Sequence, residues 1–212
     1  LAKFYEISAT ELISGEPSVV NEPVIAYHRT SKQESDIEPR DINPKVKPDK
    51  LREVLLYVLG RVGAKPNVGE TVLYKLMYFI DMDYYEKHGK SITGLTYIHN
   101  TYGPSPVSDF TAVVNDMREH DELDIVETKF FNNKQKKYLP QTTPGLQLLT
   151  AIEIKHIDEE LERLGDKNAS ELSDLSHKDT PWIVTPQGKP IDYRDVFYRT
   201  SATAVTEPDD EL

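Results

Sequence analysis

Several groups of residues in this chain look like parts of catalytic or ligand-binding motifs, and their spacing argues against each one. Gly89-Lys90-Ser91 matches the end of a phosphate-binding loop. That loop also needs a glycine five residues before Gly89, so that the backbone can wrap around the phosphates. Tyr84 stands there instead, inside a predicted helix. We therefore predict no phosphate loop.

Two further groups contain residue types used in acid–base or nucleophilic catalysis. Ser176, His177 and Asp179 lie within four residues of one another, whereas the members of a catalytic triad are usually gathered from separate elements. Asp81 and Asp83 are two apart on a predicted helix, so their side chains should point in different directions. We predict no catalytic residues and no enzymatic activity.

The metal-binding residue types are also too scattered to form a site. The chain has no cysteine, which excludes disulfides and thiolate metal ligands. No two of its six histidines are three to five residues apart, the spacing common in metal sites. They are His28, His88, His99, His120, His156 and His177. We predict no metal and no cofactor.

Charge and hydrophobicity indicate which kinds of partner the chain can bind. The net charge of -11 argues against nucleic-acid binding by these 212 residues, since phosphate contact needs clustered lysine and arginine. The basic cluster Lys134–Lys137 is interpreted as the solvated turn of a hairpin. The acidic surface would suit a basic protein partner, or it serves solubility. No apolar run approaches the ~20 residues that span a bilayer, and no signal peptide is evident, so we expect a cytoplasmic protein without membrane contact.

Hydrophobic periodicity predicts an α+β fold that is mainly helical, with a small antiparallel hairpin or sheet. Asn67 with Glu70 is interpreted as a helix cap, and Ser105 with Pro106 as another helix start. The predicted helices run from 51 to 62, 67 to 88, 105 to 117, 143 to 164 (the longest), 169 to 177 and 192 to 198. The predicted strands are 96–102, 123–130 and 137–140, the last two joined by a polar turn at 131–136.

Tyrosines are concentrated around the second predicted helix. Tyr74, Tyr78, Tyr84 and Tyr85 all fall on it, and a single apolar stripe could not bury all four. We expect Tyr78, Tyr84 and Tyr102 in the core, with Trp182 anchoring the C-terminal segment. Tyr85, Tyr97 and His99 are expected on a contact surface, where tyrosine offers rigid area with a polar tip.

The first 50 residues have a different character. In Leu1–Ile13, Ser8 and Glu11 form a capping box ahead of Leu12 and Ile13. This segment resembles the end of a lambda-repressor-like helix-turn-helix domain whose recognition helix would precede Leu1; the alternative is an unrelated amphipathic tail. A chain that starts with Leu is expected to be part of a longer protein. Residues 16–50 contain five prolines and read as a linker, in which Val24–Tyr27 is apolar enough to dock as an added strand.

A larger set of motifs resembles the Panacea, or SocA-like, antitoxin domain. Their order and spacing carry the resemblance over about Leu51 to Tyr198. The motifs are Lys75-Leu-Met-Tyr-Phe-Ile-Asp81, Tyr84-Tyr85, His88-Gly-Lys-Ser-Ile-Thr-Gly94, Tyr97, Tyr102-Gly-Pro104, Leu172-Ser-Asp-Leu-Ser-His177 and Thr180-Pro-Trp182. The expected organisation is a helix-turn-helix remnant at 1–15, a linker at 16–50, the antitoxin domain at 51–199 and a disordered acidic tail at 200–212.

The resemblance implies an antitoxin of a bacterial or phage toxin–antitoxin pair, which neutralises its toxin by direct protein contact. It implies a protein toxin as partner, DNA contact only through a region before residue 1, and allows a homo-oligomer. The alternatives are an adaptor that delivers the toxin to a protease, as the SocA-type member does, and a DNA-binding transcriptional regulator. The predicted partner-binding residues are Tyr85, Tyr97, His99, Tyr102, Gly103 and Pro104.

Overall fold

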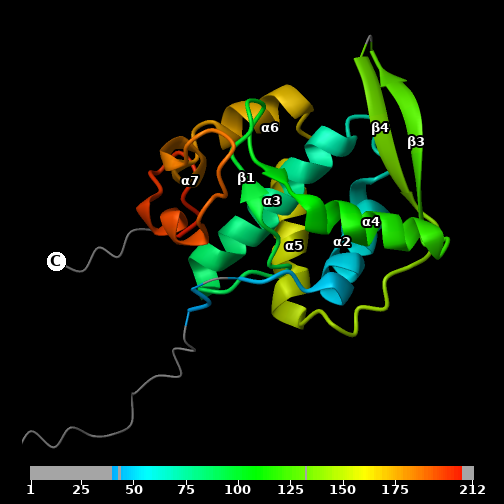
Figure 1. Cartoon of the computed structure of the whole chain (residues 1–212), viewed down its shortest axis with the longest axis horizontal. Helices are drawn as coiled ribbons and strands as arrows, with labels where there is room; N and C mark the ends of the chain where they lie inside the picture. Colours follow the sequence, from blue (N-terminus) through cyan, green and yellow to red (C-terminus); the bar gives the residue numbers. More distant parts are fainter. Residues whose placement is uncertain (1–39, 43, 132, 207–212) are drawn as a thin grey trace, which may run out of the picture. The chain divides into compact units, whose positions relative to one another are not determined.

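The computed structural model describes residues 40–42, 44–131 and 133–206 (Figure 1). The predicted helix-turn-helix remnant, Val24–Tyr27 and residues 207–212 lie outside them. The helices are α2 (Pro48–Val62), α3 (Glu70–His88), α4 (Ser108–Glu119), α5 (Ala151–Leu164), α6 (Ala169–Ser176), α7 (Thr180–Val184) and the 3-10 helix η2 (Tyr193–Tyr198). The strands are β1 (Tyr97–Ile98), β2 (Ser105–Pro106), β3 (Leu123–Phe130) and β4 (Asn133–Pro140). The prediction of a mainly helical α+β fold is confirmed.

Helix α3 is the centre of this fold. Its buried residues do not form one stripe but occupy nearly every position from Val72 to Glu86. A helix that is buried on all sides has to be covered on all sides, and α5, α6, η2, β2 and β4 all pack against it. Gly89 ends the helix in the left-handed conformation, with φ of 67°, as predicted for a helix C-terminus.

The two sheets are small and antiparallel. In the first, Tyr97 pairs with Pro106 and Ile98 with Ser105. In the second, β3 and β4 form a hairpin whose register runs from the Leu123–Pro140 pair to the Phe130–Asn133 pair. The predicted β3 is confirmed. β4 begins at Asn133 rather than Lys137, so the turn is shorter than predicted.

Three predicted helix starts are wrong. Asn67 does not cap α3: Gly69 is the N-cap, and the Asn67 amide donates to the Gly165 and Lys167 carbonyls at 3.2 and 2.9 Å. Ser105 and Pro106 form β2, and α4 begins at Ser108. The helix expected from residue 143 begins at Ala151, and α3 is longer than it.

Residues 40–42 and 44–47, which are predicted to belong to the linker, pack beside the C-terminal end of α3. The Asp41 amide donates to the Gly89 carbonyl at 2.8 Å, and the Lys47 amide donates to the Thr93 carbonyl at 2.9 Å. A side chain at Gly94, which has φ of 73°, would collide with the Lys45 carbonyl. The close approach of this segment therefore depends on glycine.

None of the helices that the structure describes has the length and apolar character needed to cross a membrane.

Candidate partner-binding surface

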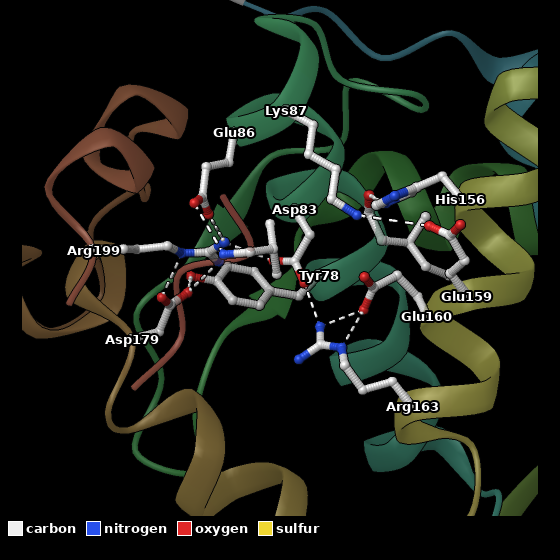
Figure 2. Close-up of polar contacts among 12 residues, drawn as sticks. Tyr78, Asp83, Glu86, Lys87, His156, Glu159, Glu160, Arg163, Asp179 and Arg199 are labelled. Carbon is white, nitrogen blue, oxygen red and sulfur yellow. Dashed lines mark hydrogen bonds and ion pairs between the residues drawn. The ribbon is translucent and has the colours of Figure 1, made fainter. Parts of the chain in front are cut away.

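A buried cluster of charged residues ties the C-terminal part of the chain to α3 (Figure 2). The Arg199 side chain, 1% exposed, lies 2.6 Å from Asp83 and 2.7 Å from Glu86, both on α3. It also donates two hydrogen bonds to Asp179, at 2.7 and 2.8 Å. Asp179 precedes α7 and Arg199 follows η2. One guanidinium therefore joins three segments that are far apart in sequence.

The cluster continues toward the surface through α5 (Figure 2). Arg163, whose side chain is 38% exposed, pairs with Asp83 and with Glu160. On the inner side, the Tyr78 hydroxyl donates to Asp179 at 2.7 Å. Tyr78 thus lies in the core, as predicted, and its polar tip is satisfied there.

Carboxylates outnumber guanidinium groups in this cluster, and the pKa values reflect it. Burial raises the pKa of Asp83, and the charge of Glu160 adds to this rise, while Arg199 and Arg163 oppose it. For Glu86, burial acts to raise the pKa, but hydrogen bonds from Arg199 and Thr206 prevail and lower it. Every carboxylate in this cluster is paired, which is typical of structural ion pairs rather than of a catalytic group.

Residues 200–206, which the sequence analysis assigns to the tail, are held on α3 by the same glutamate. Glu86 accepts hydrogen bonds from the Val205 and Thr206 amides, both at 3.0 Å, and from the Thr206 hydroxyl at 2.7 Å. Thr203 is buried. This segment is therefore part of the folded unit.

Asp81 belongs to a separate buried network, as its spacing from Asp83 predicts. It accepts hydrogen bonds from the Thr93 amide at 2.8 Å, from the Thr93 hydroxyl and from the Tyr97 hydroxyl at 2.9 Å. Burial raises the pKa of Asp81, and these hydrogen bonds oppose the rise. Its role is to fix the loop that follows α3.

The expectation that Tyr85 and Tyr97 lie on a contact surface is wrong, because both are fully buried. Tyr85 donates to the Asp41 carbonyl at 2.7 Å, and Tyr97 donates to Asp81. The assumption of a single apolar stripe on α3 caused the error: with packing all round the helix, Tyr78, Tyr84 and Tyr85 are buried together and Tyr74 partly. The reverse holds for Tyr102, expected in the core, which is 74% exposed.

His99 is half-buried against α7. Its Nδ1 lies 2.6 Å from the Thr185 carbonyl oxygen, and its ring stacks on Trp182 with centroids 4.0 Å apart. The His177 ring also stacks on Trp182, at 4.4 Å. Trp182 packs partly against the core, and its indole donates to the Asn100 carbonyl at 3.3 Å. These contacts fix the loop that carries Tyr102.

The Gly103–Pro104 corner is held from beneath by Lys75. The Lys75 ammonium donates to the Pro104 carbonyl at 2.9 Å. Gly103 has φ of 96°, and a Cβ there would lie 2.4 Å from the Ser176 hydroxyl oxygen. Ser173 donates to the Tyr102 carbonyl at 3.1 Å. A rigid corner therefore presents the Tyr102 ring to solvent.

Lys75 itself is an unusual group at this position. Its side chain is 1% exposed, and no ion pair involves it within the part of the chain that the structure describes. Burial lowers the pKa of its ammonium to about 8. The Gly103–Pro104 corner therefore covers a buried ammonium group whose charge is not balanced by an ion pair.

Residues 73–183 match the family described as antitoxin SocA-like, Panacea domain. The chain belongs to this family. No curated protein and no solved structure matches it. The family gives the protein an antitoxin-type role. The match runs from α3 into α7, so the Panacea domain includes Lys75, the Tyr102 corner and Trp182, while Arg199 lies beyond it.

The Panacea match ends at a surface that the sequence analysis missed. Ile183 and Val184 on α7 are 57% and 56% exposed, and Tyr198 on the neighbouring η2 is also exposed. We call Tyr102, Trp182, Ile183, Val184 and Tyr198 the α7 surface. The apolar run Trp182-Ile-Val184 after Pro181 was the signal available in the sequence.

Within the described ranges, no group of three or more histidine, aspartate or glutamate side chains is arranged to hold a metal ion.

Proposed function

We propose that this protein is an antitoxin that neutralises a partner toxin by direct, stoichiometric protein contact in the cytoplasm, without turnover. The observation that carries the proposal is the Panacea match over residues 73–183. The α7 surface is the proposed toxin-binding site. Exposed apolar and aromatic side chains such as Ile183 and Val184 on α7 and Tyr198 on the adjoining η2 are typical of protein–protein contacts.

The other predicted binding residues contribute to this site in different ways. Tyr102 offers its ring directly, and His99 supports the loop by stacking on Trp182. Gly103 and Pro104 shape the corner. Tyr85 and Tyr97 are buried and cannot contact a toxin directly, so they contribute only by stabilising the fold that carries the α7 surface.

The test is co-expression with the product of the neighbouring reading frame. That product alone should arrest growth, this protein should restore it, and the two should co-purify in a fixed ratio. Restored growth without a complex, or with loss of the toxin only when a protease is present, would favour the adaptor alternative. A neighbouring product that is harmless, or toxic but not neutralised, would contradict the proposal.

A second role, transcriptional autoregulation, rests on the resemblance of Leu1–Ile13 to a helix-turn-helix domain. A protein that includes the preceding region should shift promoter DNA at physiological salt. These 212 residues alone, with their net charge of -11, should not.

A further inference from the structure

The β3–β4 hairpin projects from the helices (Figure 1). Phe131 follows β3 directly and is 85% exposed, the highest value among the exposed large apolar side chains of the described residues. Its ring makes an edge contact with Phe130, with centroids 4.7 Å apart. The tip therefore presents the Phe131 ring to solvent, with the partly buried Phe130 ring beside it.

Turn chemistry does not account for Phe131. Its φ of 52° lies in the left-handed region, where glycine, asparagine and aspartate are favoured and a bulky residue is strained. Exposure of the ring to water is unfavourable as well. A residue that suits neither the turn nor the solvent points to a contact made outside this chain.

The lysine charges at the tip also destabilise the hairpin. Lys129 and Lys134 are directly opposite each other in the hairpin register, and like charges in that position destabilise a pair of strands. Neither forms an ion pair with another described residue. The hairpin from Leu123 to Pro140 has four lysines and two acidic residues, a net charge of +2 in a chain of net charge -11.

A groove beside the hairpin leaves room for a partner. Its volume is about 510 Å³, and its lining includes Phe130 and Lys134 from the hairpin and Thr71 from the start of α3. The lining also includes Lys136 and the acidic Glu70 and Glu127, so the groove has charges of both signs beside its apolar surface. The unpaired positive charge lies at the tip, where Lys129 and Lys134 would meet carboxylates of a partner.

We propose that the hairpin tip, comprising Lys129, Phe130, Phe131 and Lys134, is a second contact for the toxin, and that it fits an apolar pocket rimmed by carboxylates. This inference rests on the proposed function, because it takes the toxin as the partner. Nucleic acid and anionic membranes would also attract lysine and phenylalanine. Both are extended anionic surfaces, and the remainder of the chain carries a net charge of -13 that would repel them.

Two substitutions test toxin binding without destabilising the fold, because each should stabilise the hairpin. Phe131→Asn places a favoured residue in the left-handed turn. Lys134→Glu converts a like-charge pair into an opposite-charge pair with Lys129. Both variants should unfold at the same temperature as the wild type or a higher one. Lys155→Glu, on the exposed surface of α5, is the control that makes the same change in net charge.

The measurement is titration calorimetry of each purified variant with the toxin, at low and at physiological salt. We expect Phe131→Asn and Lys134→Glu each to weaken the affinity at least ~10-fold, and the loss for Lys134→Glu to be smaller at higher salt. Lys155→Glu should bind like the wild type. If the wild type binds the toxin and both hairpin variants bind equally well, this inference is wrong while the proposed function stands.

If the wild type does not bind the toxin, the proposed function fails first. Retention of the wild type by anionic vesicles or by DNA, lost in Phe131→Asn and in Lys134→Glu, would assign the tip to those ligands and overturn the inference. A loss of affinity in Lys155→Glu equal to that in Lys134→Glu would attribute the effect to net charge alone and would also overturn it.

Discussion

The buried charged cluster around Arg199 differs from the two exposed sites, the Tyr102 corner and the hairpin tip. Each uses the kind of residue that is usually found in the other environment. Arg199, Asp83 and Asp179 are charged and almost completely buried. Tyr102 and Phe131 are aromatic, and water surrounds them. Globular proteins generally keep unpaired charges outside and large apolar groups inside. In these regions, charged side chains hold the segments together and aromatic rings face outward.

The difference follows from what each region has to do. A buried guanidinium with three carboxylate partners tolerates few alternative arrangements, because any partner left behind would be a buried unpaired charge. Such a cluster specifies one arrangement of α3, α7 and η2. Exposed aromatic rings add little to the free energy of unfolding, but they supply rigid area to a partner. The three predictions below test this division, from the largest expected effect on stability to the smallest.

Arg199→Met should have the largest effect. The substitution leaves Asp83, Glu86 and Asp179 without their shared partner, and loss of one member of a buried ion pair typically costs ~3–5 kcal/mol. We expect a free energy of unfolding lower by that amount, measured by urea denaturation. Arg61→Met is the matched control: its side chain is 57% exposed and pairs with Asp158, so the change should be below ~0.5 kcal/mol. Equal effects of the two substitutions would refute the assigned role of Arg199.

Lys75 should make stability depend on pH in the alkaline range. Its pKa is about 8 in the folded chain against an ordinary value of 10.5. Between these values the unfolded chain holds a proton that the folded chain has released, so this residue's contribution to stability rises with pH and is lost as pH falls toward 8. The full change is ~3 kcal/mol.

Comparison of the wild type with Lys75→Met isolates this contribution, since all other groups titrate in both proteins. At neutral pH the methionine variant should be the more stable, because it buries no cation. Its advantage should shrink steadily between pH 8 and pH 10.5. An advantage that stays constant with pH would show that Lys75 is not the titrating group.

Tyr102→Ala should have the smallest effect on stability, below ~0.5 kcal/mol, because the ring is solvated. The same substitution should weaken toxin binding about 10-fold or more if the α7 surface is the binding site. Tyr97→Phe provides the contrast: it removes a buried hydroxyl from Asp81 and should cost ~1–2 kcal/mol without touching the surface. A stability loss for Tyr102→Ala as large as that for Tyr97→Phe would erase the distinction between the two regions.

Much of the fold could be predicted from local sequence signals. The helix predicted after Leu51, the helix predicted to end at His88 and the strand predicted at 123–130 rest on short-range features, and all three predictions are confirmed. The helix caps were less predictable. Asn67 has the right residue type and spacing for a cap, but a distant carbonyl at Gly165 takes its amide.

The buried site could not be predicted in the same way. Arg199 lies 116 residues from Asp83, and nothing local in the sequence connects them. The exposure of Tyr85 and Tyr102 depends on how distant elements pack around each residue, which is a property of the whole fold. The motif order identified the family, but it could not show which tyrosines face out.

The position of Arg199 also constrains the order of events during synthesis. The whole Panacea match, including the carboxylates of α3 and Asp179, is translated before Arg199. Until that residue leaves the ribosome, the emerging chain has to keep those acidic groups in water and cannot close its core around them. A nascent chain interrupted between Ile183 and Arg199 would contain the entire matched region and still be a substrate for proteases.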